Sequence, residues 1–405
     1  MPEAEVQLYS NVPLMRAAEL RTLRGHPATI GAYNVNFYAQ SEGVLKGLMR
    51  AEAPGILQAS KGANQFQGGA DKIAYMVREA MKNIKFNGAV SLHLDHGDEK
   101  AAMSCIENGF SSVMIDCSDV KKFTHIQNLE ITKRITDEAH KRGISTEFEY
   151  GGLGGVEEDV EGKSSYADYR VVPAFFILTG ADSGATTYGT SHGPFKGETD
   201  KVSLSVAAQC YQILYVFRIN EDYYLVSHGS STVPAEFVAR INAKGGNLKG
   251  TSGMNEGVLR QVARFMRKVN IDTDLRLKMT ADLREYFVAH PDAGKDSELV
   301  AYMQGIGDGS IKAIDVKTGT VIPAEEVTDP RNWLQEINKN APDKLREDYH
   351  NSGDERFIEV MEMLSNSIAD HVVHLSGDVF GGQGLVAEVD RSLTLEEMAR
   401  RYAGK

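Results

Sequence analysis

The chain has 405 residues, of which 42% are hydrophobic and 25% charged, and its 44 Lys and Arg against 56 Asp and Glu leave a net charge of −12. This composition excludes a disordered or fibrous protein. The acidic balance argues against binding to a phosphate backbone, so we expect no nucleic-acid partner. Three scattered cysteines argue against a disulfide framework. Without an apolar leader or an apolar run of about 20 residues, we expect a cytoplasmic protein that makes no membrane contact.

Short β-branched runs alternate with helical patterns from residue 29 to residue 274. In the stretches between the runs, such as 41–53, 71–84 and 255–268, apolar residues recur at the spacing of a helix that covers a sheet. The eight expected strands are TIGAYNV (29–35), GILQAS (55–60), AVSLHLD (89–95), SSVMID (111–116), ISTEFEY (144–150), SGATTYG (183–189), YYLVSHG (223–229) and KVNIDTD (268–274).

Strands that alternate with helices form parallel sheets, and a count of eight favours closure into a barrel. An open dinucleotide-binding sheet would carry GxGxxG after an early strand, whereas GGLGG (151–155) follows the fifth strand and lacks this pattern. We therefore predict an α/β protein, a (β/α)8 TIM barrel with a C-terminal helical extension. The expected divisions are a lead-in at 1–28, the catalytic barrel at 29–290, and an extension at 291–405 with DPRNWL (329–334), a helical section at 342–371, the loop-like SGDVFGGQG (376–384) and a final helix.

Polar side chains gather where the expected strands end. In a parallel barrel these positions converge on one mouth, where barrel enzymes carry their active sites. Random placement would scatter such residues over both ends of the barrel, so the pattern indicates an active site. The residues are Asn34, Ser60, Asp95, His96, Asp116, Glu149, His192, His228, Asn270 and Asp272.

Three of these residues are histidines, His96, His192 and His228, and each is followed directly by glycine. Imidazoles from different strands suit a divalent metal of the zinc type with one coordination position left open for substrate. Such a metal polarises a carbonyl group and holds negative charge on its oxygen. A single histidine of this kind would more often be a surface or core residue, but three at strand ends predict a metal site.

The nearby carboxylates have alternative roles. Asp95 directly precedes His96, and strand alternation predicts that its side chain leaves on the opposite side, toward substrate, unless it orients a histidine. Asp116 and Glu149 either bind the metal, orient its ligands or bind a second cation. Glu157 lies in the glycine-led segment GGLGGVEEDVEG (151–162), which is typical of a mobile lid carrying an acid or base, or of a solvated charge run.

GSST (229–232), before the helical PAEFVARI, predicts a phosphate loop at a helix N-terminus, where backbone N–H groups and hydroxyls bind anions. NIDTD (270–274) follows the eighth strand, next to the position where barrels commonly bind phosphate. The Ser, Thr and Asp residues of both segments also serve as ordinary helix caps.

Six segments in order together resemble the class II fructose-bisphosphate aldolases, although each alone is a weak signal. The resemblance runs from about residue 29 to residue 334. The segments are HLDHG (93–97), VMIDCS (113–118), EFEYGGLGGVEED (147–159), GTSHGPFKG (189–197), SHGSS (227–231) and NIDTDLR (270–276).

The resemblance implies a catalytic Zn²⁺ held by His96, His192 and His228, which stabilises the enediolate of dihydroxyacetone phosphate. It implies that Asp95 transfers the proton of the C4 hydroxyl, and that Glu157 exchanges the C3 proton of the ketone. The resemblance further implies that Asp116 and Glu149 support the metal and that Asn270 contacts the enediolate. It implies a monovalent-cation and phosphate region near Lys196 and a second phosphate bound by Arg331. The residues that it implies for the first phosphate are Gly193, Gly229, Ser231, Asp272 and Thr273.

The family pattern is not matched everywhere. Glu325 and Glu326 stand before Arg331 where some relatives have lysines, and would weaken a second phosphate site if they point inward. The tail beyond residue 334 is longer than many relatives need, and its HVVHLSGDVFGG (371–382) has no assigned role beyond packing or oligomer contact. Arginine often reaches the second phosphate from a partner subunit in this family, so we expect a homodimer or higher homo-oligomer.

The leading hypothesis is a zinc-dependent lyase of glycolysis and gluconeogenesis, which splits the phosphorylated sugar fructose 1,6-bisphosphate into dihydroxyacetone phosphate and glyceraldehyde 3-phosphate. One alternative acts on tagatose bisphosphate or another ketose phosphate by the same mechanism. A metal-dependent hydrolase would normally open with an HxH pair that the first strand lacks. A non-catalytic barrel would not need the combination of Asp95, Glu157 and three histidines. A Schiff-base aldolase would need a buried lysine inside the barrel, and none stands out at a strand end.

Overall fold

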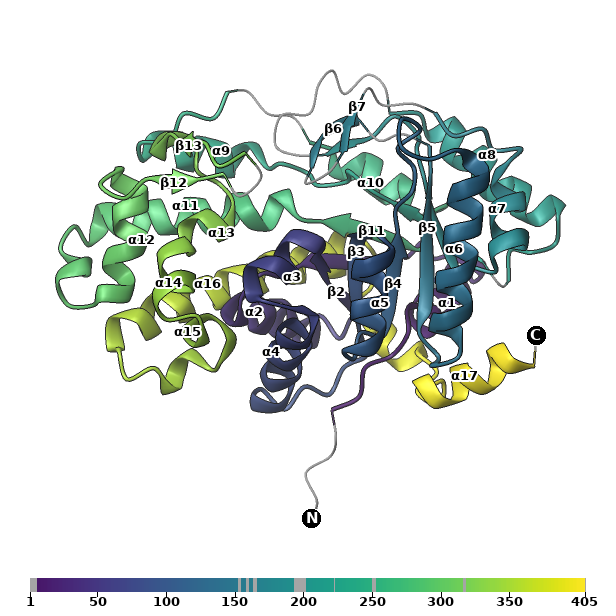
Figure 1. Ribbon diagram of the computed structural model, residues 1–405, viewed down its shortest axis with the longest axis horizontal. Coiled ribbons are helices and arrows are strands. Elements are labelled where there is room, and N and C mark those ends of the chain that lie inside the picture. The colour runs from purple at the N-terminus through teal and green to yellow at the C-terminus, as the bar shows by residue number, and fades with distance from the viewer. Residues whose placement is uncertain are drawn as a thin grey trace, which may run out of the picture.

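The protein is described by a computed structural model over residues 6–151, 154–157, 160–162, 166–192, 202–221, 223–249, 253–315 and 318–404. Eight parallel strands close into a barrel in the order β1-β11-β10-β8-β5-β4-β3-β2, which confirms the predicted (β/α)8 fold (Figure 1). The strands are β1 Ile30–Asn34, β2 Gly55–Ser60, β3 Val90–Gly97, β4 Ser112–Ile115, β5 Ser145–Tyr150, β8 Ser183–Thr186, β10 Tyr224–Ser227 and β11 Lys268–Ile271.

Helices follow the strands and cover the barrel. The last barrel strand ends at Ile271, three residues before the predicted end, because α11 begins at Thr273. Helix α10 ends at Val262, short of the predicted residue 268. The helices up to the extension are α1 Asn11–Leu23, α2 Tyr38–Arg50, α3 Lys61–Gln67, α4 Ala70–Asn83, α5 Glu99–Glu107, α6 His125–His140, α7 Val172–Thr179, α8 Leu204–Val216, α9 Ala235–Ala243, α10 Glu256–Val262 and α11 Thr273–Ala289.

A small second sheet lies outside the barrel and corrects two expectations. The glycine-led segment forms two antiparallel strands, β6 Gly154–Glu157 and β7 Val160–Gly162, instead of a plain loop. Strand β9, Ser191–His192, pairs in parallel with β6, so that His192 lies opposite Gly155. His192 therefore belongs to this sheet and lies beyond the end of barrel strand β8. Figure 1 shows β6 and β7 above the barrel.

The C-terminal extension is mostly helical, as predicted, but its loop-like SGDVFGGQG begins within a π-helix. Its elements are a 3-10 turn Ala293–Lys295, α12 Glu298–Asp308, β12 Ala313–Ile314, β13 Val321–Ile322, a 3-10 turn Ala324–Glu326, α13 Pro330–Trp333, α14 Gln335–Asn340, α15 Asp343–Arg346, a 3-10 turn Tyr349–Asn351, α16 Glu355–Val373, the π-helix His374–Val379, a 3-10 helix Leu385–Glu388 and α17 Leu395–Ala403.

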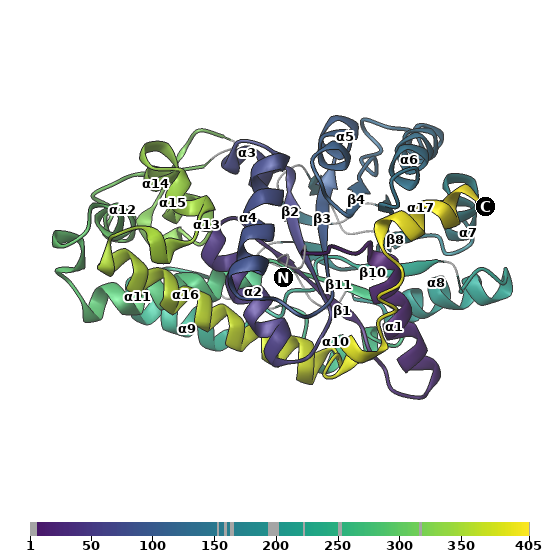
Figure 2. The ribbon, with the colours of Figure 1, turned by 90° about the horizontal axis from the view of Figure 1, so that it is seen from below.

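Helix α16 packs tightly along α2 and also contacts α11 (Figure 2). The close approach to α2 requires glycine at two positions one turn apart. A Cβ atom on Gly43 would lie 2.5 Å from the carbonyl oxygen of Ser365, and one on Gly47 would lie 2.7 Å from that of Ala369. The extension is therefore fitted to the barrel helices along the length of α16.

The last part of the chain covers the lower end of the barrel, opposite the mouth. Leu385 and Val389 join an apolar cluster with Leu14 of α1 and Ile30 and Ile56 of β1 and β2. Beyond them, α17 reaches the other side of the barrel and contacts α6. No helix among the described residues is long and apolar enough to span a membrane.

Candidate active site

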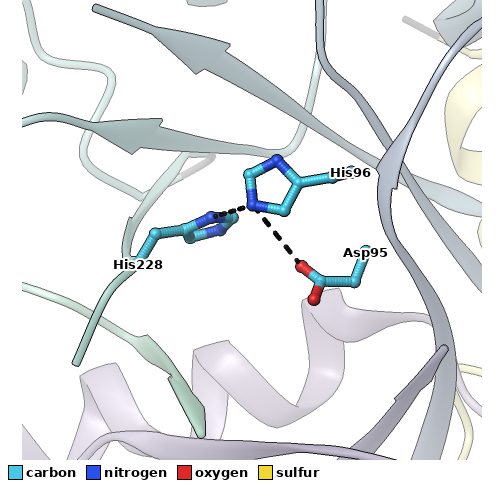
Figure 3. A group of neighbouring side chains, drawn as sticks. All are labelled: Asp95, His96 and His228. Carbon is cyan, nitrogen blue, oxygen red and sulfur yellow. Dashed lines mark hydrogen bonds and ion pairs between the residues drawn. The ribbon is translucent and has the colours of Figure 1, made fainter. Parts of the chain in front are cut away.

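The centre of the site is built on a β-bulge in β3. The register between β3 and β4 shifts between Leu94 and Gly97, and His96 has a φ of 51°, in the left-handed region. Such a bulge re-aims consecutive side chains. As a result Asp95 and His96 point into the same cluster, with 4.0 Å between Asp95 Oδ1 and His96 Nε2, instead of leaving the strand on opposite sides (Figure 3). The expectation from simple strand alternation was wrong here.

Two histidines from distant strands face each other at this point. His96 Nε2 lies 3.0 Å from Nδ1 of His228, which directly follows β10 (Figure 3). The other nitrogen of each ring contacts a carboxylate: His96 Nδ1 lies 2.8 Å from Asp116 Oδ2, and His228 Nε2 lies 2.9 Å from Glu147 Oε1. Each carboxylate orients its ring, so that the two facing nitrogens are directed at one point. This donor set fits a zinc-type cation between the rings.

Further acids surround the histidine pair. Glu149 Oε2 lies 3.6 Å from His96 Nδ1 and 3.7 Å from His228 Nδ1, and this buried atom has no hydrogen-bond partner among the described residues. Burial alone would lower the pKa of His96, but the neighbouring Asp116, Asp95 and Glu149 raise it well above its ordinary value. Positive charge is thus favoured where the two rings meet. Two overlapping groups have metal-ligand geometry: Asp95, His96 and His228, and His96, Asp116 and Glu149.

Asp95 is held by three amide groups. Asn34 donates from Nδ2 to Oδ2 over 3.1 Å, Gln58 donates from Nε2 to the same oxygen over 3.2 Å, and Asn270 donates from Nδ2 to Oδ1 over 3.0 Å. Their parent strands β2, β1 and β11 follow one another on one side of β3 in the barrel. Asn34 and Asn270 were predicted, whereas Gln58 was not. The carboxylate therefore has a fixed position beside the histidine pair.

A second layer of polar residues lies directly below the first, and it was missed. Lys268 Nζ contacts Glu147 Oε2 over 3.0 Å, and His93 Nε2 lies 3.8 Å from the same oxygen, all within the buried interior. His93, Glu147 and Lys268 each precede a predicted site residue by two positions. Because strand side chains alternate, residues two apart share a face. This spacing was a signal that could have identified the layer.

The predicted phosphate residues form a second cluster next to His228. Gly229 follows this histidine with a φ of 63°, and Ser231 Oγ accepts from the backbone N–H groups of Asp272 over 3.3 Å and of Thr273 over 3.2 Å. The serine therefore contacts the N-terminus of α11, rather than that of α9, which begins only at Ala235. The two predicted phosphate segments meet at this point.

Arg331 lies in α13 and is almost fully buried. Its Nη2 contacts Asp329 Oδ2 over 2.6 Å, and Arg276 joins Asp329 to Asp272 through contacts of 2.7 and 2.6 Å. Ion pairs within one chain thus connect Arg331 to the phosphate cluster. Glu325 and Glu326, which precede it, are exposed in a 3-10 turn.

The remaining predicted residues are not brought into the cluster by a described contact. Ser60 pairs with Asp95 in the β2–β3 register, but its hydroxyl oxygen caps α3 by accepting from Ala63 N over 3.1 Å. Gly193 and Lys196 lie outside the described residues, as do the side chains of Glu157 and His192.

A closed parallel barrel with histidines and carboxylates at its mouth defines a metal-dependent barrel enzyme. Comparisons with known proteins identify the family. The family described as fructose-bisphosphate aldolase class-II matches residues 18–355. The chain is 36% identical over 273 residues to the fructose-bisphosphate aldolase of Giardia intestinalis, a match that covers 66% of this chain and 81% of that protein.

Two solved structures share the fold. The YdjI aldolase of Escherichia coli K12 superposes with a TM-score of 0.58 at 17% identity, covering 93% of this chain and 99% of the other. The fructose-bisphosphate aldolase of Campylobacter jejuni superposes with a TM-score of 0.54 at 21% identity, covering 90% and 96%. The chain belongs to the class II fructose-bisphosphate aldolases, zinc-dependent lyases that reversibly cleave fructose 1,6-bisphosphate to dihydroxyacetone phosphate and glyceraldehyde 3-phosphate. This confirms the resemblance.

Proposed function

We propose that this chain cleaves fructose 1,6-bisphosphate with Asp95 as the base and with a zinc ion held by His96, His228 and His192. The observation that carries the proposal is the cluster of Asp95 with the facing nitrogens of His96 and His228. Both rings are oriented by carboxylates, which is the arrangement that metal-binding histidines use. The Asp116 carboxylate would orient His96 through its Nδ1, and the buried Glu149 Oε2, which has no hydrogen-bond partner among the described residues, would add negative charge beside both rings.

A bound zinc ion polarises the ketone carbonyl and favours negative charge on its oxygen. Asp95 removes the proton of the C4 hydroxyl as the C3–C4 bond breaks, so that C4 becomes the aldehyde carbon and the bonding electrons pass to the ketone half. Asn270 donates to Asp95 and keeps the carboxylate at this position. Glu157 then returns a proton to C3 of the ketone. In the condensation direction each proton moves the opposite way.

Substrate binding uses the two phosphate groups. We assign the ketone phosphate to Gly193, Gly229, Ser231, Asp272 and Thr273, supported by the contact of Ser231 with the first residues of α11. We assign Arg331 to the second phosphate and Ser60 to substrate binding, and ion pairs join Arg331 through Asp329 and Arg276 to Asp272 of the same chain. We assign Lys196 to a region that binds a monovalent cation and phosphate. Residues 29–290 act as the catalytic unit and 291–405 as its extension.

We further propose a homodimer or higher homo-oligomer. Exposed apolar side chains on neighbouring helices support it, namely Ile177 and Leu178 at the end of α7 and Val216 and Phe217 at the end of α8. Sedimentation velocity of the wild-type enzyme tests this proposal, and a monomer at micromolar concentration would contradict it.

The role of Asp95 is tested with Asp95→Ala in zinc-loaded enzyme. Loss of the acid–base group should lower kcat for fructose 1,6-bisphosphate by about 10²- to 10⁴-fold while one zinc ion per chain is retained. Asp137→Ala, on the exposed surface of α6, is the matched control and should leave both values unchanged. Loss of zinc in Asp95→Ala would instead make Asp95 a metal ligand.

Three further measurements test the rest of the proposal. Removal of zinc with a chelator should abolish cleavage, and stoichiometric zinc should restore it. Glu157→Ala should chiefly slow the exchange of the C3 proton of dihydroxyacetone phosphate. Cleavage of fructose and tagatose 1,6-bisphosphate should be compared in parallel, because faster cleavage of the tagatose epimer would change the substrate but not the mechanism.

A further inference from the structure

The segment HVVHLSGDVFGG (371–382) takes no part in the reaction described above, yet it lies directly behind the phosphate cluster. It begins in the last turn of α16 and continues through the π-helix. Ser376 Oγ lies 2.7 Å from the hydroxyl of Tyr33 in β1, and the backbone N–H of Thr29 donates to the carbonyl of Phe380. The segment is thus joined to the barrel wall beside β11.

The loop that follows His228, residues 229–233, has a backbone that must be held in place. Val233 has a φ of 49°, in the left-handed region, which is strained for a β-branched residue. Such conformations persist only where surrounding contacts impose them. The end of this loop is therefore one point at which surrounding contacts hold its backbone in place.

Asp274, in the first turn of α11, makes those contacts. Its Oδ2 accepts from the backbone N–H of Thr232 over 2.9 Å and from the Thr232 hydroxyl over 2.8 Å, and its Oδ1 accepts from the backbone N–H of Val233 over 2.7 Å. The carboxylate is fully buried. Three charge-assisted hydrogen bonds from one side chain fix both residues at the end of the loop.

His371 lies on the far side of this carboxylate. Its Nε2 is 3.8 Å from Asp274 Oδ2 and has no hydrogen-bond partner among the described residues. Its ring also packs edge-on against Phe237 of α9, with 5.3 Å between the ring centroids. The imidazole therefore fills the space between α11 and α9, the two helices that follow the two phosphate segments.

We propose that His371 is a positioning residue for the substrate phosphate, which acts through Asp274 on the 229–233 loop. Within the described part of the chain it makes no hydrogen bond, ion pair or ring contact with a proposed metal ligand, and it limits the positions available to Asp274. The proposal rests on the assignment of Gly229 and Ser231 to phosphate binding. The C-terminal extension thereby contributes to substrate affinity, in addition to packing.

The test compares His371→Ala, His371→Gln and His374→Ala in zinc-loaded full-length enzyme by titration with dihydroxyacetone phosphate. We expect His371→Ala to weaken binding about tenfold and to raise KM for fructose 1,6-bisphosphate similarly, because residues that act through others modulate affinity on this scale. The value of kcat and the zinc content should stay within about twofold of the wild type. His371→Gln retains a side-chain donor and should recover part of the affinity.

His374→Ala is the matched control. This imidazole contacts Glu256 of α10 over 2.8 Å and is partly exposed, so its removal should leave the affinity for dihydroxyacetone phosphate unchanged. Thr232→Val, which removes the hydroxyl donor to Asp274, should weaken binding as His371→Ala does, and provides a second route if His371→Ala fails to fold.

Unchanged affinity in folded His371→Ala, with Ser231→Ala clearly weakened, would overturn this proposal alone. Unchanged affinity in Ser231→Ala would instead overturn the phosphate assignment on which it rests. The slow cleavage of fructose, the analogue without phosphate groups, distinguishes an effect on phosphate binding from a general loss of activity. It should be equal in His371→Ala and wild type, and a parallel loss would also contradict the proposal.

Discussion

Glu147 and Glu149 lie two residues apart on β5, share one face of the strand, and are both buried, yet they have opposite environments. Burial raises the pKa of both carboxyl groups. At Glu147 the nearby Lys268 and His228 overcome this effect and hold the pKa well below its usual range. At Glu149 the neighbouring Asp116 adds to it, and the pKa lies well above its usual range.

The difference separates two layers of the barrel interior. In the lower layer, around Glu147, acid and base are already paired, so the layer is complete without a ligand. In the upper layer, around Glu149, acids outnumber bases and the histidines face one another. A cation is needed there to balance the charge. Such a contrast between adjacent layers identifies the site for a metal more sharply than the presence of histidines alone.

The largest effect on stability is expected from Lys268→Met. This substitution removes the cation that pairs with Glu147 and leaves a buried carboxylate, at a cost of about 3–5 kcal/mol in the free energy of unfolding. Lys133→Met, which removes an exposed partner of Asp137, is the control and should cost less than about 1 kcal/mol. Urea unfolding of both variants measures the difference, and equal costs would show that the lower layer is not a paired unit.

Glu147→Gln should have a smaller effect than Lys268→Met, and we expect it as a loss of zinc affinity. The neutral amide is a weaker acceptor for His228 Nε2–H, and loss of such a partner typically weakens metal binding about 10- to 100-fold. Competition with a zinc chelator measures the affinity without reference to activity. Lys268→Met disturbs the same layer without touching His228, so an equal loss of zinc affinity in that variant would contradict an orienting role for Glu147.

The smallest expected effect is on the pH dependence of stability in zinc-free protein. A carboxyl group whose pKa is raised on folding, such as Glu149, makes the folded state less stable as the pH rises from the ordinary carboxyl range through the raised pKa. A lowered pKa, as at Glu147, contributes stability that is present above the ordinary range and lost as the pH falls below it.

Urea unfolding of zinc-free Glu147→Gln and Glu149→Gln across this pH range tests the assignment. Glu149→Gln should flatten the decline toward higher pH, and Glu147→Gln should flatten the decline toward acid. If both variants flatten the decline in stability on the same side of the pH profile, the pKa values of the two glutamates are not shifted in opposite directions.

Much of the fold could be predicted from the sequence, because each barrel strand is a local β-branched run between helical patterns. Positions after the runs also predicted the cluster of Asn34, Asp95, His96 and His228. The last strand was expected to run three residues too far, because NIDTD continues the strand pattern to residue 274. Its Thr and Asp residues instead begin a helix.

The lower layer was missed for a different reason. Glu147 and Lys268 are 121 positions apart, and a buried charge becomes plausible only when its partner is known. The bulge at His96 was also hidden, because a left-handed residue that is not glycine leaves no sequence signal. Local patterns therefore predicted the strands and the residues at the barrel mouth. The buried lower layer depends on pairing between distant strands, which local patterns do not show.

The position of the last helix has a consequence for folding during translation. Tyr402 of α17 stacks on His140 at a centroid distance of 3.5 Å, and its hydroxyl donates to Asp182 over 2.7 Å, below β5 and β8. Ribosomes add about 5–20 residues per second, so some 7 to 26 seconds pass between completion of β11 and translation of Tyr402. During this interval a nascent barrel with all eight strands lacks its lower cover. Until the tail has been translated, Leu14, Ile30 and Ile56 lack the apolar contacts that Leu385 and Val389 give them in the complete chain.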